Sequence, residues 1–216
     1  MSPPRRSAST LVWSLLPLLA LAGATDALMI EHSKDLLAVY MTGNTTKLGG
    51  FVAQAMWGKA AEIASVIGTF VAAATVAAWL GDRAARWRSS LILTVTGLLL
   101  AGAAPLAAQA PQPYSLATVL TIAAAMGTLN QVRVDEPGVT FATGSLVKLG
   151  RCLAAAQWAS ASDALLRWLC FLMGALMGAV MDGLLGTDTL LVLAALAVSG
   201  AAVVGCVAAR TQPVSA

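Results

Sequence analysis

Long apolar runs separated by short polar connections dominate the chain. About 20 apolar residues in a helix cross the hydrocarbon core of a bilayer, and six runs have about that length. They predict an all-α integral membrane protein with six transmembrane helices, in which residues 1–216 form a single membrane domain. The connections leave no room for a sizeable soluble domain. The predicted spans are Leu11–Ile30, Ala60–Leu80, Ser90–Ala108, Tyr114–Gln131, Ala164–Leu184 and Thr189–Ala209.

The composition supports the same fold class. Of the 216 residues, 58% are hydrophobic and 11% are charged, and the mean hydropathy is +0.80. Soluble domains are usually about a quarter charged, so this chain is suited to lipid. The net charge of +3 indicates membrane topology rather than nucleic-acid binding, because the arginines stand at the ends of the apolar runs.

One stretch of the sequence recurs 101 positions later. TGNTTKLG at 42–49 returns as TGSLVKLG at 143–150, and eight of the sixteen residues at 42–57 are matched. Only two matched pairs are alanines, so an Ala-rich composition does not explain the repeat. It predicts two related halves, residues 11–108 and 114–209, as in many transporters. The pairs are Thr42/Thr143, Gly43/Gly144, Lys47/Lys148, Leu48/Leu149, Gly49/Gly150, Ala53/Ala154, Ala55/Ala156 and Trp57/Trp158.

The arginines set the expected topology, because positive residues prefer the cytoplasmic side. Three of them stand in the connection 81–90 and others stand near both ends of the chain, which places this connection and both termini inside. The connections 109–113 and 182–188 carry no Lys or Arg and belong outside. The arginines used are Arg5, Arg6, Arg83, Arg86, Arg88 and Arg210.

Six spans threaded through these assignments make residues 31–59 begin and end on one side, and residues 132–163 on the other. Each copy of the motif then lies in a re-entrant segment, and the two halves have opposite orientation. This arrangement is an inverted-topology internal repeat. The rival count of eight spans would place the arginines of 81–90 outside, against the strongest charge signal.

The repeated motif combines a turn with a helix start. Its glycines permit a sharp turn, and Asn44 and Ser145 suit the N-cap position of helices expected at 45–57 and 146–158. Helices of this length reach from the middle of a membrane to its surface. Both N-termini would therefore meet near the midplane, with unpaired N–H groups and partial positive charges.

Two such helix starts predict a site for an anionic or carbonyl-bearing solute, or a barrier against cations. Lys47 and Lys148 add full charges one turn into each helix, unless they extend to the membrane surface or pair with a carboxylate. The alternative is structural: the motif caps a short buried helix and lets the two halves pack closely. The candidate residues of the motif are Thr42, Gly43, Asn44, Lys47, Thr143, Gly144, Ser145 and Lys148.

Asp26 lies late in the first apolar run, where a charge is costly unless it is paired or functional. It could carry a proton or bind a cation, and equally it could be the buried partner of Lys47, Lys148 or a helix N-terminus. The repeat offset aligns it with Gly127, so one half alone has the carboxylate. Asn130 forms a polar end on the corresponding second-half helix, and it completes the predicted substrate-binding set with Asp26.

No enzyme, metal or cofactor site is predicted. The chain has no G-x-x-x-x-G-K-[ST], G-x-S-x-G, H-E-x-x-H or G-x-G-x-x-G motif, so an ATP-driven pump is not expected. The lone histidine, His32, has no other His or Cys at metal-ligand spacing. The three cysteines lie within or beside apolar runs, and no two of them form a CxxC motif. We expect Cys152, Cys170 and Cys206 to be small, buried, unpaired thiols.

The first 24 residues also fit a secretory signal peptide. Arg5 and Arg6 precede the apolar run from Leu11, and Ala22-Gly23-Ala24 resembles a cleavage site. The run is longer than a usual signal core and the rest of the chain is itself membranous. We therefore expect an uncleaved first transmembrane helix.

Four segments resemble the YoaK family of bacterial inner-membrane proteins, a domain-of-unknown-function family. The resemblance extends from about Leu18 to Ala209, and the M-T-G-N block after an upstream D-A is its most specific part. Where the family often continues Ala-Met-Gly with Gln-Asn, this chain has TLNQ at 128–131. The resemblance implies a multi-pass protein of the inner (plasma) membrane, without an established substrate. The segments are TDA at 25–27, YMTGNTTKLG at 40–49, AMG at 125–127 and ATGSLVKLG at 142–150.

These features predict a secondary transporter or channel for a small solute, anionic or zwitterionic. The rival function is a non-transporting membrane scaffold or assembly partner, in which the repeat is purely architectural. A polar cavity at the midplane lined by Asp26, Asn44 and Ser145 would favour transport, whereas solid Ala and Leu packing would favour the scaffold. The expected partners are the lipid bilayer and the small solute, a homo-oligomer is possible, and no nucleic acid is expected.

Overall fold

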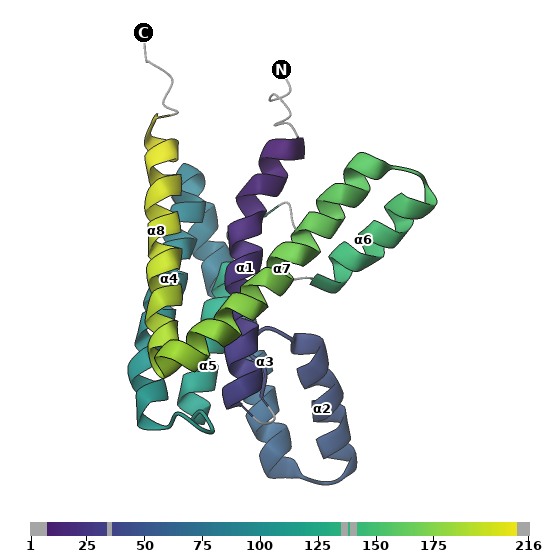
Figure 1. Ribbon diagram of the computed structural model, residues 1–216. Helices are drawn as coiled ribbons and strands as arrows, with labels where there is room; N and C mark the ends of the chain where they lie inside the picture. Colours follow the sequence, from purple (N-terminus) through teal and green to yellow (C-terminus); the bar gives the residue numbers. More distant parts are fainter. Residues whose placement is uncertain (1–7, 34–35, 135–137, 139–141, 211–216) are drawn as a thin grey trace.

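The computed structural model describes residues 8–33, 36–134, 138 and 142–210, and the regular elements among them are helices. Figure 1 shows their arrangement. Two short 3-10 turns, η1 (Ala85–Trp87) and η2 (Gly186–Asp188), join longer helices. The α-helices are α1 (Ala8–His32), α2 (Met41–Ala53), α3 (Trp57–Ala84), α4 (Arg88–Gln109), α5 (Leu116–Leu129), α6 (Ala142–Ala154), α7 (Trp158–Leu185) and α8 (Thr189–Arg210).

The repeat seen in the sequence extends through three helices of each half. α2 and α6 have 13 residues each, α3 and α7 have 28, and α4 and α8 have 22. Each of these elements, with η1 and η2, begins and ends 101 positions after its counterpart; Met41 begins α2 and Ala142 begins α6. The structural repeat is therefore longer than the sixteen positions in which the sequence match was found.

The same turn ends α2 and α6. Ala55 has a φ of 55°, and the N–H of Met56 donates to the carbonyl of Phe51 at 2.9 Å. These are features of the Schellman motif, which closes helix C-termini and usually places glycine at the left-handed residue. The turn recurs 101 residues later, where Ala156 has a φ of 52°. The matched alanines of the sequence repeat thus stand at the points where these helices end.

The two motif helices begin and end about four residues earlier than the sequence predicted. We expected helices at 45–57 and 146–158, and the structure has Met41–Ala53 and Ala142–Ala154. The motif glycines consequently lie in the first helical turn instead of before it. The reason at the C-terminal end is the left-handed Ala55, which stops α2 and allows Trp57 to begin α3.

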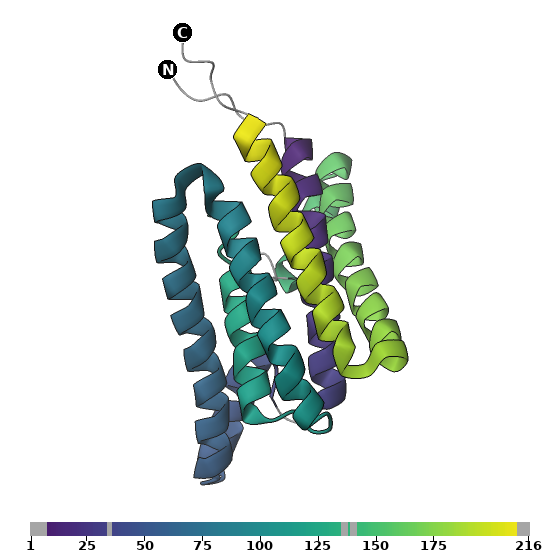
Figure 2. The ribbon, with the colours of Figure 1, turned by 90° about the vertical axis from the view of Figure 1, so that its left-hand side faces the viewer.

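Each motif helix forms a hairpin with the helix that follows it, and the turns of these two hairpins, α2–α3 and α6–α7, lie at opposite ends of the molecule (Figure 1). The start of α1, the α3–α4 turn, the α6–α7 turn and the end of α8 lie at one end, the upper end in Figures 1 and 2. We call it the basic end, because the α3–α4 turn contains Arg86 and α8 ends at Arg210. The end of α1, the α2–α3 turn, the α4–α5 connection and the α7–α8 turn form the opposite end. α2 runs from mid-height to the opposite end, whereas α6 runs from mid-height to the basic end (Figure 1).

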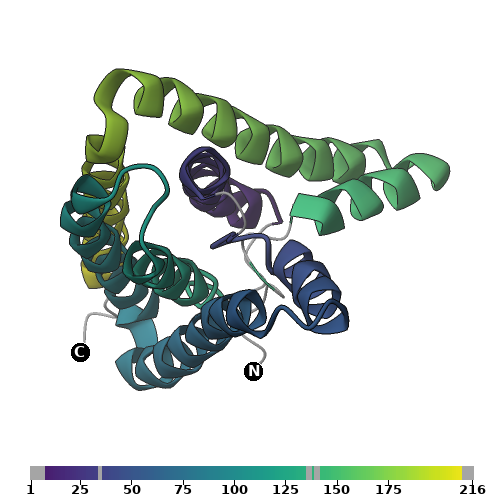
Figure 3. The same cartoon turned by 90° about the horizontal axis from the view of Figure 1, so that it is seen from below.

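Each half contributes its first helix to the other half. α1 packs along α7 and α5 packs along α3, while α4 and α8 pack on each other. Figure 3 shows α1 near the centre with α7 along one side. A Cβ at Gly23 would lie 2.1 Å from the carbonyl oxygen of Phe171, and one at Gly127 would lie 2.3 Å from that of Phe70. Backbones therefore touch directly where the halves exchange helices, as small residues permit in membrane proteins.

Three helical segments of the described residues are long and apolar enough to cross a membrane: Leu15–His32, Trp57–Gln109 and Trp158–Arg210. The second and third each contain two helices joined by a 3-10 turn. The predicted span Tyr114–Gln131 is shorter in the structure, because α5 has 14 residues and rises about 21 Å at 1.5 Å per residue.

Large apolar side chains cover much of the outer surface. Leu98, Leu184 and Val203 are 64%, 78% and 64% exposed. A soluble monomer rarely exposes apolar surface on this scale, whereas lipid accommodates it. The chain is thus an all-helical protein with the surface of a membrane protein.

Substituting Gly127 with alanine tests the contact between α5 and α3. The added methyl group would meet the Phe70 backbone, and overpacking of this kind costs about 1–3 kcal/mol of stability. Gly68→Ala is the matched control, because Gly68 also lies within a helix but has nothing within 4 Å of its Cβ position. We expect Gly127→Ala to lower the thermal unfolding midpoint in detergent and Gly68→Ala to leave it unchanged or raise it. Equal midpoints would contradict the close packing.

Candidate functional site

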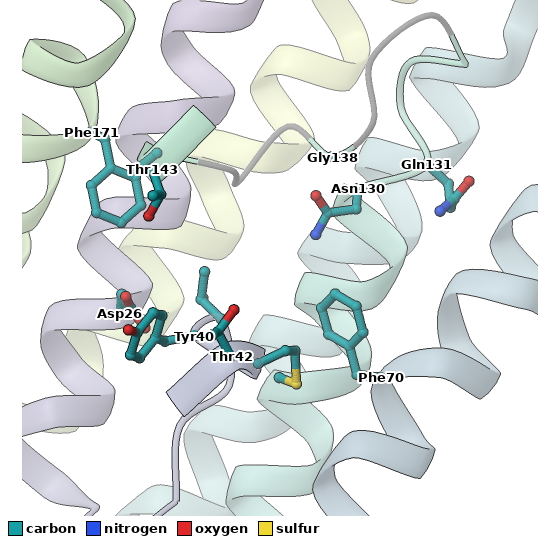
Figure 4. A pocket seen from close by; sticks show the side chains of 12 residues that line it. Asp26, Tyr40, Thr42, Phe70, Asn130, Gln131, Gly138, Thr143 and Phe171 are labelled. Atoms are coloured by element: carbon teal, nitrogen blue, oxygen red, sulfur yellow. The ribbon is translucent and has the colours of Figure 1, made fainter. Parts of the chain in front are cut away.

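A cavity of about 430 Å³ is lined by the starts of both α2 and α6. Residues of α1, α3 and α7 and the two residues that follow α5 complete its wall, so both halves of the chain contribute to it. Figure 4 shows the side chains that line the cavity. They are Asp26, Val39, Tyr40, Met41, Thr42, Phe70, Asn130, Gln131, Gly138, Ala142, Thr143 and Phe171.

The cavity wall contains pairs of residues that the repeat relates. Thr42 and Thr143 stand at equivalent positions in α2 and α6, and Phe70 and Phe171 at equivalent positions in α3 and α7. The two phenylalanines lie on opposite sides of the cavity in Figure 4. The cavity thus lies at the contact between the two halves, the place where internally repeated transporters hold their substrate.

Asp26 is the charged side chain among the described residues that line the cavity. It belongs to α1, and the repeat places Gly127 at the equivalent position of α5. Its Oδ1 atom is buried and has no hydrogen-bond partner among the described residues. A carboxylate oxygen in this position is costly unless a solute, a proton or water satisfies it.

The first turn of α2 presents N–H groups beside this carboxylate. Met41 N–H donates to the Val39 carbonyl at 2.9 Å, and Asn44 N–H donates to the Tyr40 carbonyl at 3.2 Å. The N–H groups of Thr42 and Gly43 have no acceptor among the described residues. They carry the partial positive charge of a helix N-terminus, which favours an anionic or carbonyl group.

Asn44 has a different role from the predicted N-cap. Its side chain is fully buried, and its Oδ1 accepts from the Leu37 N–H at 3.2 Å while its Nδ2 donates to the Leu37 carbonyl at 2.6 Å. Both backbone polar groups of Leu37, its N–H and its carbonyl, are thereby satisfied, as a buried backbone requires. The amide fastens the segment before α2 onto the helix and so helps to position Tyr40 at the cavity.

Gly43 also acts through Tyr40. A Cβ at Gly43 would lie 2.4 Å from Cδ1 of the Tyr40 ring, so glycine lets the ring lie across the first turn of α2. The glycine therefore shapes the wall of the cavity without lining it.

The structure brings four of the ten predicted site residues to the cavity: Asp26, Thr42, Asn130 and Thr143. Asn130 is buried at the end of α5, where its Nδ2 donates to the Met126 carbonyl at 2.8 Å. The other six do not line the cavity. Of these, Gly43 and Asn44 support the wall, Lys47 is half-buried on α2, Lys148 is exposed on α6, and Gly144 and Ser145 are half-buried in the first turn of α6.

Sequence reasoning missed the aromatic residues of the wall. Tyr40 directly precedes the motif, and it was assigned no role. Phe70 and Phe171 are identical residues at the 101-position offset, outside the sixteen positions that were compared. Extending the repeat alignment along α3 and α7 would have found them.

Comparison with known proteins gives a family. No curated protein matches the chain, and no solved structure matches it. Residues 14–204 match the family described as "Protein of unknown function (DUF1275)", which is most of the chain and includes every residue that lines the cavity. The chain therefore belongs to the DUF1275 family of proteins of unknown function.

Proposed function

We propose that the chain is a multi-pass inner-membrane protein, YoaK-like, that acts as a secondary transporter or channel for a small anionic or zwitterionic solute. The observation that carries the proposal is the cavity between the starts of α2 and α6, with Asp26, whose buried Oδ1 has no hydrogen-bond partner among the described residues, in its wall. The solute binds there, between the two halves.

The membrane arrangement we propose has six spans and two re-entrant hairpins. α1, α3, α4, α7 and α8 cross the membrane, and the shorter α5 crosses together with the residues that follow it. The turns of the α2–α3 and α6–α7 hairpins lie at opposite membrane surfaces, because α2 and α6 run in opposite directions from mid-height (Figure 1). Trp57 and Trp158, 65% and 68% exposed at the starts of α3 and α7, suit the two interfaces, where tryptophan is enriched.

The charges of the cavity favour a solute that carries both signs. Each helix start contributes roughly half a positive charge, and Asp26 contributes a full negative charge when it is ionised. A zwitterion can place its acidic group at the helix starts and its cationic group at Asp26. An anion would instead enter with a proton on Asp26, which makes this residue the candidate for proton coupling.

The alternative function is a membrane scaffold or assembly partner. The backbone contacts of Gly23 with α7 and of Gly127 with α3 fit it, because close packing of the halves would be the only purpose of the repeat. The cavity favours transport, since a scaffold has no use for a buried carboxylate oxygen without a hydrogen-bond partner, such as Oδ1 of Asp26.

Cysteine-accessibility labelling tests the proposed topology. A cysteine introduced at Arg86 lies in the α3–α4 turn of the basic end and should be protected from a membrane-impermeant thiol reagent in intact cells. A cysteine at Gln112, in the α4–α5 connection, is the matched control and should react. External labelling at position 86 would contradict both the topology and the inverted repeat.

Uptake into proteoliposomes tests transport itself. The panel should contain amino-acid zwitterions, small carboxylates and small cations, each with and without a pH gradient. We expect flux for a zwitterion or an anion, and no flux for a simple cation, because the helix starts repel it. Absence of flux for every class would favour the scaffold.

Substituting Asp26 with asparagine tests its role in the cavity. A hydrogen bond to a charged group contributes about 1.5–3 kcal/mol, so the flux at subsaturating solute should fall on the order of 10- to 100-fold and lose its pH dependence. Glu62→Gln on α3 is the control, because Glu62 is exposed and does not line the cavity. A folded Asp26→Asn protein with unchanged, pH-dependent flux would exclude Asp26 from the mechanism.

A further inference from the structure

A second cluster of ionisable groups lies at the opposite end, away from the cavity. His32, the last residue of α1, stacks on the ring of Tyr114 with ring centroids 4.5 Å apart and an interplanar angle of 8°. Its Nε2 lies 2.9 and 2.8 Å from the two carboxylate oxygens of Asp182 on α7. Its Nδ1 lies 2.6 Å from the carbonyl oxygen of Pro111 in the α4–α5 connection.

Both ring nitrogens of His32 therefore face groups that accept hydrogen bonds. A carbonyl oxygen can only accept, and an ionised carboxylate can only accept. Two arrangements satisfy the geometry: an imidazolium beside ionised Asp182, or a neutral imidazole that donates to Pro111 and accepts from protonated Asp182. Both contain the same number of protons, one more than a neutral imidazole with an ionised carboxylate. The positions of these acceptors therefore fit a pair that holds one extra proton, whichever residue carries it.

The pair is buried enough for this proton to matter. The side chains of His32 and Asp182 are 7% and 10% exposed, so water cannot easily replace a lost hydrogen bond. If the proton left, a ring lone pair would face either the carboxylate or the Pro111 carbonyl. One of the contacts of His32 would then become repulsive.

The groups around His32 also favour retention of the proton. Tyr114 faces His32 from the α4–α5 connection, and its N–H donates to the His32 carbonyl at 2.9 Å. Burial and the charge of Asp182 raise the pKa of Tyr114 above its usual range, so this ring stays neutral. Glu31 precedes His32 on α1, and both residues line a surface cavity at this end of the molecule. An anionic carboxylate beside His32 favours retention of the proton. Lys34 and Asp35 lie outside the described residues.

The basic end has a comparable contact that cannot lose its charge. Arg88 at the start of α4 bonds Asp82 at 2.6 Å, and its Nε donates to the carbonyl of Gln131, just after α5, at 3.0 Å. It joins α3, α4 and the end of α5, as His32 joins α1, the α4–α5 connection and α7. Arginine remains protonated at every physiological pH, whereas histidine titrates near neutrality.

We propose that His32 and Asp182 form a proton-binding site whose occupancy fastens the end of α1 to α7 and to the α4–α5 connection. With the proton bound, the contacts of His32 with Asp182, Pro111 and Tyr114 are all favourable, and the end of α1 stays packed against its neighbours. When the proton leaves at higher pH, one contact is lost and the end of α1 loosens from its neighbours. On the proposed topology the site faces the outside, so external acidity closes this end and the permanently charged basic end does not respond.

The lone histidine makes the site directly observable. Protein labelled with ¹⁵N-histidine and purified without a polyhistidine tag gives ring signals from His32 alone, which can be followed in detergent from about pH 5 to about pH 10. We expect both ring nitrogens to be protonated, or one to be hydrogen-bonded to a protonated Asp182, at low pH. A single transition should occur at higher pH. A ring that stays neutral beside an ionised Asp182 throughout would overturn the proposal.

Asp182→Asn is the informative variant, because the amide has nearly the same shape. Its N–H group can donate to Nε2 of a neutral imidazole, so the site no longer needs the extra proton. We expect the His32 transition to move to lower pH and the pH dependence of the unfolding midpoint, a fall of a few degrees above the transition in the wild type, to disappear. Arg88→Gln is the control at the basic end, and it should leave the His32 transition in place. An unchanged transition in Asp182→Asn would also overturn the proposal.

Neither measurement depends on transport. A failed uptake assay would contradict the proposed function but not the proton site. A missing His32 transition would contradict the proton site but not the proposed function.

Discussion

The contact of bare backbones between α1 and α7 is the constraint on which the rest of the structure depends. Gly23 lies against the Phe171 carbonyl, and on the other side Gly174 lies so close to α1 that a Cβ would be 2.1 Å from the Ala20 carbonyl oxygen. Helices in lipid gain little from hydrophobic burial against each other and associate through close packing instead. These glycines therefore decide that α1 belongs to the second half, and Gly127 decides that α5 belongs to the first.

The exchange of first helices brings the starts of α2 and α6 to the same cavity. α1 lies along α7 and therefore packs against the α6–α7 hairpin, and α5 lies along α3 and packs against the α2–α3 hairpin. Each hairpin is thus contacted by the first helix of the other half. The starts of α2 and α6 are consequently left at mid-height with the cavity between them. Buried irregular backbone must be satisfied within the protein, and the paired hydrogen bonds of Asn44 with Leu37 meet this need for the segment before α2.

The inverted arrangement is broken at chemically important positions. Asp26 lines the cavity, whereas its counterpart Gly127 packs against the Phe70 backbone and does not line it. His32 has Arg133 as its counterpart, and Asp182 has Gly81. The architecture is repeated while the ionisable groups are not, which lets the two ends of one small fold respond differently to protons.

The sequence by itself determined the all-helical fold class, most helix positions and the repeat, because apolar length and the matched Ala55 and Trp57 are local properties that need no partner. It also pointed to Asp26, Thr42, Asn130 and Thr143, since polar residues within an apolar run are conspicuous. Only the tertiary structure decided that Asn44 turns toward Leu37, that Lys47 and Lys148 stay out of the wall, and that Phe70 and Phe171 enter it. Apolar residues occupy most faces of α3 and α7, so no stripe in their sequence distinguishes the packed face from the lipid face. The direction of each side chain was fixed only when glycine contacts chose which helix lay against which.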